Sequence, residues 1–340
     1  MNLFEQQRSN RRRTWAIMLV FVSFLVLLGA GFDLFVLGQQ GVPIPIGALA
    51  ALGVGGAGAW SGYLHGDRAV LLSANAVPVD KAAATDWPDA PLKLQQFNNI
   101  VEEMAIASGL PKPAAYIIPD TDPNAFATGR DPQHASIAVT RGLLDLLNRE
   151  QLQGVVGHEM SHIRNYDIRL MTVVAALVGA IALIADWSAR AMRHGFRAGG
   201  GRRGGKDKGG GAALLVVLAI WLVAMIVAPF VTRLLALAVS RRREYLADAS
   251  AAELTRNPSA LAAALQTIEF AAEPTRSIKQ GSAHLCIADP LGRAVTLKEG
   301  FWADLLATHP PMVKRIALLK GMAYEKRGSD PILTNSVSRA

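Results

Sequence analysis

Cysteine is almost absent from this chain of 340 residues, in which Cys286 is the single example. One thiol excludes an intramolecular disulfide and a zinc site built from several thiolates. A lone cysteine is most often a small buried hydrophobic residue, so we assign Cys286 no role. Metal chemistry in this chain would have to use histidine and carboxylate side chains.

Charged and aromatic residues are also scarce. Charged residues make up 18% of the chain and hydrophobic residues 51%, whereas soluble globular chains carry about 25% charged residues. This composition predicts that membrane lipids form part of the solvent. The formal net charge is +8, but aromatic residues make up only 6%. Because the Lys and Arg residues flank apolar runs instead of forming a stripe with stacking aromatics, no nucleic-acid partner is expected.

Four apolar runs predict about four hydrophobic helices. Trp15–Leu37 and Val42–Leu64 are each 23 residues long, Leu170–Ala185 has 16 and Ala212–Val231 has 20, against about 20 for a spanning helix. The first run exceeds the roughly 7–15 apolar residues of a signal peptide, which favours an uncleaved anchor. The first two runs predict a transmembrane hairpin that returns to the cytoplasm near His65.

An Arg/Gly-rich stretch, residues 189–211, separates the third and fourth runs. Such a composition cannot build a core and predicts a flexible loop; RNA binding is an alternative. If both runs span, this loop lies opposite the catalytic side, against the positive-inside tendency. If they are re-entrant, it stays cytoplasmic. In either case the crossings are even in number, so the segments before and after share one compartment. We favour a spanning hairpin.

The sequence between the second and third runs reads as soluble α/β structure. Leu92–Ser108 has helical spacing and stops at Gly109. Ala115–Ile118 and Ala135–Thr140 are short strand-like runs, separated by a turn-rich loop, Asp120–Asp131. Further helices are expected from a capping box at Asn148 and Gln151 to about Asn165, and at residues 241–254, 258–271 and Met312–Tyr324.

The strongest chemical signal is His158-Glu159-Met160-Ser161-His162, on the helix that follows Asn148. Histidines four residues apart lie on one helix face, so both imidazoles can reach one ion. A zinc ion held there polarises a water molecule and the scissile carbonyl, and Glu159 takes the water proton as general base. The alternative is a pair of surface histidines beside a carboxylate.

Catalytic zinc takes three protein ligands, and Glu244 is the candidate for the third. Glu244 and Asp248 are four residues apart, so one can bind the metal while the other accepts a hydrogen bond from a ligating imidazole. Surface ion pairs between Glu244 and Arg241–Arg243 are the alternative. The spacing alone leaves both interpretations open.

The chain resembles the HtpX family of membrane zinc peptidases, which is related to the CAAX prenyl-protein endopeptidases. The resemblance rests on four blocks in order, Pro123–Gly129, Asn148–Asp167, Arg243–Asp248 and Thr308–Pro311. It implies a Glu-zincin with one Zn2+ per chain held by His158, His162 and Glu244, with Asp248 in support. It also implies polypeptide substrates, among them misfolded membrane proteins, and a role in quality control under stress.

Two further residues are candidates for substrate or transition-state contacts. Asn124 can hydrogen-bond substrate from its loop, or it can stabilise a turn. His309, with Arg315 nearby, can stabilise the oxyanion or bind substrate, or it can simply precede a helix. Ala135–Thr140 is expected to be an edge strand that pairs with an extended substrate.

Together these features predict an α-helical membrane anchor plus a mainly α (α+β) Glu-zincin metallopeptidase domain with a small β-sheet. We expect a multi-pass protein of the cell inner membrane whose catalytic site faces the cytoplasm. The alternatives are a CAAX-type prenyl-protein endopeptidase and a non-catalytic zinc-bearing membrane scaffold. The expected parts are a basic cytoplasmic N-terminus (1–14), a transmembrane hairpin (15–65), a first catalytic part (66–168), two hydrophobic segments with the Arg/Gly-rich loop (169–232), a second catalytic part (233–327) and a polar tail (328–340).

Overall fold

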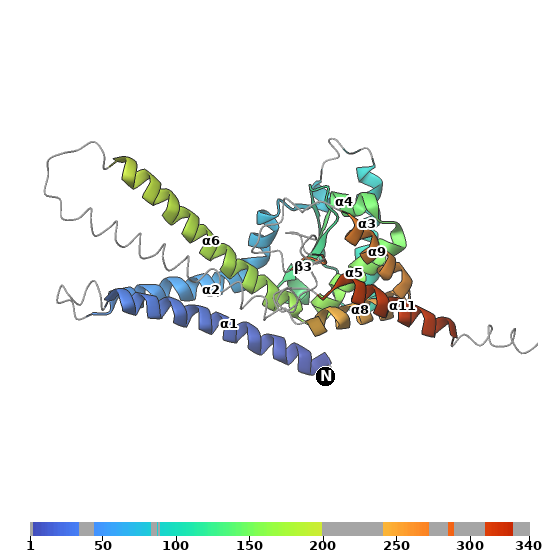
Figure 1. Ribbon diagram of the computed structural model, residues 1–340, viewed down its shortest axis with the longest axis horizontal. Helices are drawn as coiled ribbons and strands as arrows, with labels where there is room; N and C mark the ends of the chain where they lie inside the picture. The colour runs from blue at the N-terminus through green and yellow to red at the C-terminus, as the bar shows by residue number, and fades with distance from the viewer. Residues whose placement is uncertain are drawn as a thin grey trace, which may run out of the picture.

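A computed structural model describes residues 3–33, 44–82, 87, 89–198, 241–271, 285–288 and 310–328. A body of helices around a small sheet stands beside long helices that project away from it (Figure 1). The helices are α1 (Leu3–Phe32), α2 (Ile46–Ser73), η3 (Val79–Lys81), α3 (Ala90–Ser108), η4 (Pro132–His134), α4 (Arg141–Leu146), α5 (Arg149–Arg164), α6 (Asp167–Ala198), α8 (Arg241–Thr255), α9 (Pro258–Phe270) and α11 (Met312–Gly328). The mainly helical fold with a small sheet is confirmed.

The sheet has four strands in the order β1-β2-β4-β3, with β1 at Val77–Pro78, β2 at Ala114–Ile118, β3 at Ala125–Gly129 and β4 at Ala135–Thr140. Strand β4 runs parallel to β2 and antiparallel to β3.

Two predictions about this sheet are wrong. The expected loop at 120–131 contains strand β3, and β4, expected at the edge, lies between two partners. The edge of the sheet opposite β1 is formed by β3.

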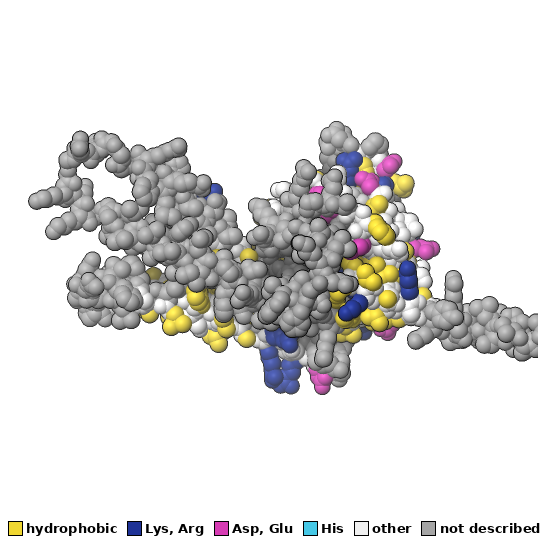
Figure 2. Space-filling view, viewed as in Figure 1, with side chains coloured by type: hydrophobic (Ala, Val, Ile, Leu, Met, Phe, Trp, Pro, Cys, Tyr) yellow, Lys and Arg dark blue, Asp and Glu magenta, His cyan; other side chains and the backbone are white. Residues whose placement is uncertain are grey.

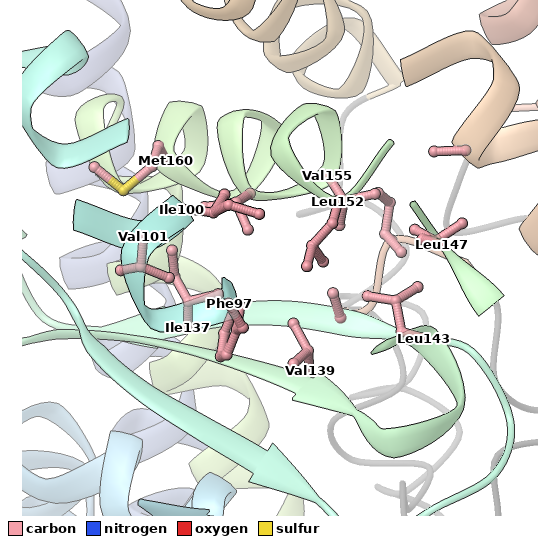
Figure 3. Close-up of a cluster of buried hydrophobic side chains, with 14 of the residues drawn as sticks. Phe97, Ile100, Val101, Ile137, Val139, Leu143, Leu147, Leu152, Val155 and Met160 are labelled. Carbon is pink, nitrogen blue, oxygen red and sulfur yellow. The ribbon is translucent and has the colours of Figure 1, made fainter. Parts of the chain in front are cut away.

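Both faces of the sheet are covered, so side chains alternate between two cores. On β4, Ile137 and Val139 pack with Phe97 of α3 and Val155 of α5 (Figure 3). Ala138 points the other way, into a cluster formed with the end of α2 and with α6. This alternation follows from the two-residue period of a strand. The core on one face of the sheet therefore packs α5 directly against that face.

Helix α5 begins with the expected capping box. The Asn148 side chain accepts from the Gln151 amide, and the Gln151 side chain accepts from the Asn148 amide. Glycines then let two helices approach it closely: a Cβ at Gly154 would lie 3.0 Å from Leu261 on α9, and one at Gly157 would lie 3.1 Å from Thr255 on α8. The small residues of α5 therefore bring α8 close to its histidine-bearing face.

Helices α1 and α2 lie antiparallel. Gly29 faces Gly47, and Leu25 faces Gly55. Asp33, just past α1, accepts from the amides of Gly47 and Ala48 in the first turn of α2, which satisfies donors that a helix start leaves unpaired. Among the described residues, one helical stretch, Gln7–Gly31 of α1, is long and apolar enough to cross a membrane.

The third apolar run differs from its prediction. Helix α6 continues to Ala198 without a break, so residues 189–198 are helical and not part of a loop. The rest of the Arg/Gly-rich stretch, residues 199–211, and the fourth apolar run at 212–231 lie outside the described residues.

Candidate metal centre

Three side chains from two helices converge inside the body. His158 and His162 lie one turn apart on α5, and Glu244 lies in the first turn of α8. Their ligand atoms lie within 4.8 Å of one another. The two Nε2 atoms are 3.2 Å apart, and the Glu244 oxygens are 3.6 Å from Nε2 of His158 and 3.5 Å from Nε2 of His162.

These separations fit a tetrahedral metal ion. Bonds of about 2.0–2.1 Å at tetrahedral angles place neighbouring ligand atoms about 3.3–3.4 Å apart. The distance between the two Nε2 atoms lies close to this value, and each Glu244 oxygen lies close to it from one of the two imidazoles. All three residues are buried. The residues present therefore fit a zinc ion with a position left for water or substrate.

The hydrogen bonds at Nδ1 fix which nitrogen of each ring faces the cluster. Nδ1 of His158 lies 2.9 Å from Asp248, and Nδ1 of His162 lies 3.1 Å from Asp167. A carboxylate holds the proton on the nitrogen that it faces, which leaves the Nε2 lone pair for a metal. Both imidazoles are thus oriented as ligands by a carboxylate behind them.

Glu159 is buried beside these ligands, with 1% of its surface exposed. Within the described residues, neither of its oxygens accepts a hydrogen bond of normal geometry, although the backbone of Ala127 on β3 faces it. Burial, reinforced by the nearby Glu244 carboxylate, raises the pKa of Glu159 to about 7. Such a carboxylate accepts a proton more readily than a solvated one.

Arg315 of α11 contacts the carboxylates of the cluster. It is completely buried, and its Nε and one terminal nitrogen donate to the two oxygens of Asp248 at 2.8 and 2.7 Å. The other terminal nitrogen donates to the carbonyl of Ile287 at 3.2 Å and lies 3.4 Å from Glu244. Burial tends to raise the pKa of Asp248, but the Arg315 charge outweighs it and lowers that pKa to about 2.

The cluster favours a positive charge on the side of His162, whereas burial lowers the pKa of His158. When all its acids are ionised, they outnumber its guanidinium groups by two, a charge that a divalent cation neutralises; the acids are Glu159, Asp167, Glu244 and Asp248, and the bases are Arg243 and Arg315. Burial opposes protonation of His162, but the Asp167 and Glu244 carboxylates outweigh it and raise its pKa to about 9. The field that stabilises a proton on His162 also attracts a metal ion.

The other predicted site residues lie differently. Asn124 is buried at the start of β3, where its oxygen accepts from Ala125 and its amide donates to the Ala288 carbonyl. These contacts support the turn-stabilising alternative, and a substrate contact stays a prediction. Arg315 binds carboxylates inside the body, so it does not present its charge to solvent. His309 lies outside the described residues.

Asp167, which faces Nδ1 of His162, was not predicted as a site residue. It also accepts from Asn10 of α1 at 2.7 Å and lies 3.4 Å from Arg243. A carboxylate five residues after the second histidine is a weak signal, because that offset does not place it on the same helix face. Asn10 carries no signal, since it reaches the site across 157 residues of sequence.

Comparisons with known proteins identify a family and several relatives of the chain. The model of peptidase family M48 matches residues 91–323, which contain every site residue described above except Asn10. A protease HtpX homologue of Caldanaerobacter subterraneus is 42% identical over 94% of this chain and 98% of its own length, and one of Streptococcus gordonii is 40% identical over 94% and 100%. The crystal structure of S. mikatae Ste24p is similar with a TM-score of 0.43 and 15% identity, covering 93% of this chain and 67% of its own.

The family model spans more than half of the chain, and the HtpX relatives match it almost from end to end. The matched residues include the helix on which two buried imidazoles face a glutamate of a second helix. The chain therefore belongs to peptidase family M48 and is a membrane-bound metallopeptidase that resembles the HtpX proteases.

Proposed function

We propose that the chain is a zinc-dependent endopeptidase in which His158, His162 and Glu244 hold one Zn2+ and Glu159 is the general base. The observation that supports this most is the convergence of three metal-ligand atoms beside a buried carboxylate with an elevated pKa. When bound, zinc supplies Lewis-acid activation of water and of the scissile carbonyl. Asp248 and Asp167 orient the two imidazoles, and Glu159 accepts the proton of the attacking water and passes it to the leaving amine.

Phe126 of β3 forms an antiparallel bridge with Cys286, and the outer edge of β3 beyond this bridge is the proposed binding site for the substrate backbone. The carbonyl of Ala125 accepts from the amide of Ile287, so it points away from β4. Backbone direction alternates along a strand, so the N–H and C=O of Ala127 also point outward, on the side that faces Glu159. An extended peptide paired there would bring a peptide bond to the cluster with little dependence on its side chains. A cleavage pattern with one strictly fixed motif would contradict this mode.

Helix α1 is the proposed membrane anchor, with the catalytic site on the cytoplasmic side. Several of its apolar side chains are exposed, including Leu19 and Leu27, and Arg11–Arg13 are exposed at its polar end. In the space-filling view, Lys and Arg side chains gather beneath the body (Figure 2). Apolar helix surface beside arginines is typical of a cytoplasmic membrane boundary. We further propose misfolded or membrane proteins as substrates, which lie within reach of a site held at this surface.

Sidedness is measured with single cysteines in a chain that lacks Cys286. A cysteine at exposed Glu150 should resist a membrane-impermeant maleimide in intact cells and react after permeabilisation. Reaction in intact cells would place the body on the outer side. A second cysteine at Gly205 reports whether the chain crosses the membrane between α6 and α8.

The general base is tested by Glu159→Gln in the full-length protein. We expect unchanged zinc content and a loss of casein cleavage of about 10²–10⁴-fold, the range that general acid–base catalysis contributes. Glu150→Gln is the matched control, because Glu150 lies on the same helix but is exposed. Cleavage by Glu159→Gln at the rate of the control would remove the assignment. A farnesylated peptide in the same assay separates a general peptidase from a prenyl-protein endopeptidase.

A further inference from the structure

The polar end of α1 is built into the metal centre. Asn10 is 2% exposed, although it lies among exposed arginines. Its side-chain amide donates to Asp167 at 2.7 Å and to the carbonyl of Asn165 at 3.0 Å. One turn later Thr14 is also fully buried and donates to the Asn10 carbonyl. A polar pair buried at this point is unusual for the solvated end of a membrane helix.

Asp167 connects this amide to a proposed metal ligand. One of its oxygens accepts from Asn10, and the other lies 3.1 Å from Nδ1 of His162. Arg243 lies 3.4 Å from the oxygen that Asn10 also contacts. Because a carboxylate is planar, fixing one oxygen fixes the direction of the other. The Asn10 amide therefore helps to set the angle at which Asp167 holds the His162 ring.

The apolar part of α1 starts close to this contact. The candidate membrane stretch begins at Gln7 and includes Asn10 itself, and Gln7 also donates to the carbonyl of Arg164 at 2.8 Å. In Figure 1 the N-terminal end of α1 lies beneath the helical body, near α8. The anchor thus meets α5 where the HExxH helix ends, at the turn that leads into α6.

We propose that Asn10 is a positioning residue for the metal ligand His162, acting through Asp167, so that the membrane anchor completes the metal centre. This inference rests on the proposed function, because it takes His162 to be a ligand. It gives the N-terminal segment a role beyond holding the protein at a membrane. Displacing the end of α1 from the body would leave the Asp167 oxygen that accepts from Asn10 with only the longer contact to Arg243, and the His162 ring would be held less firmly.

The test measures zinc affinity by chelator competition on the full-length protein in detergent, together with kcat and KM for casein. Asn10→Leu keeps the size of the side chain and removes the amide. Changes behind a metal ligand lower affinity by about 10–100-fold; Asn10 is one residue further away, so we expect a loss of about tenfold with KM unchanged. The control is Gln7→Leu, which removes another hydrogen bond between α1 and the end of α5 without touching Asp167. Its affinity should stay within about twofold, as for most substitutions away from a key contact.

A reciprocal exchange separates positioning from folding. Asn10→Asp alone puts a second carboxylate against Asp167 and should weaken zinc binding. When Asp167→Asn is added, the amide nitrogen at position 167 can donate to the carboxylate at position 10, and the amide oxygen at position 167 can accept from His162. The double variant should therefore bind zinc more tightly than Asn10→Asp. Wild-type affinity in Asn10→Leu, equal losses in Gln7→Leu, or no recovery in the double variant would each overturn the proposal. If the wild-type protein itself bound no zinc, the proposed function would fail instead.

Discussion

The two imidazoles of the cluster are held by the same kind of group but from opposite parts of the molecule. His158 faces Asp248, and Arg315 of α11 donates two short hydrogen bonds to Asp248 inside the body. His162 faces Asp167, which accepts from the neutral amide of Asn10 on α1. Asp248 thus receives two short bonds from one charged group, whereas the guanidinium nearest Asp167, that of Arg243, lies 3.4 Å away. One support is therefore strong and internal, and the other is weaker and comes from the membrane anchor.

Breaking the internal support should have the largest effect. Arg315→Met leaves Asp248 and Glu244 buried without their guanidinium partner. Removing one member of a buried ion pair costs about 3–5 kcal/mol, and this loss should appear as a lower midpoint of denaturant unfolding. Lys314→Met is the control, because Lys314 is the exposed neighbour on the same helix. Equal midpoints for the two variants would show that Arg315 is not a main support.

The two carboxylates sharpen the comparison. Asp248→Asn and Asp167→Asn each weaken the hold on one imidazole, and such changes lower metal affinity by about 10–100-fold. Asp248→Asn should lie near the upper end, because it removes the carboxylate that binds the buried Arg315 through two hydrogen bonds and leaves that charge only Glu244 at 3.4 Å. Asp167→Asn should lie near the lower end. Zinc competition measures both, and the reverse order would contradict the difference between the two supports.

The exposed ion pair of Lys93 and Asp145 should have the smallest effect on stability. Partial burial tends to raise the pKa of Asp145, but Lys93 and the Trp87 N–H outweigh it, so the pKa lies below its ordinary value. A lowered carboxyl pKa adds stability above the unfolded-state pKa and loses it as pH falls through the folded one. Because the pair is exposed, Asp145→Asn should cost less than about 1 kcal/mol at neutral pH. Unfolding of both proteins near pH 2 and pH 7 should show that this difference disappears in acid.

The sequence predicted what local pattern encodes. The capping box at Asn148 and Gln151 and the apolar spacing up to Asn165 gave the bounds of α5, and with them the shared face of His158 and His162. The stop of α3 at Gly109 was equally local, since that glycine takes the left-handed conformation. Signals of this kind come from neighbouring residues, so one sequence is sufficient to show them.

Contacts between distant segments were not predictable in the same way. Strand β3 is five small or aromatic residues between turn formers, and only its pairing with β4 makes it a strand. The edge of the sheet depends on strand order, which the period of two does not encode. Asn10 looked like part of a solvated basic tail because its partner Asp167 lies 157 residues away.

The most direct test of the central claim is the zinc content and X-ray absorption spectrum of the full-length protein compared with Glu244→Ala. We predict one zinc per chain bound by nitrogen and oxygen at about 2.0–2.1 Å without sulfur, and a large loss of zinc in the variant. Zinc retained at one per chain in Glu244→Ala, or a sulfur ligand from Cys286, would contradict the account.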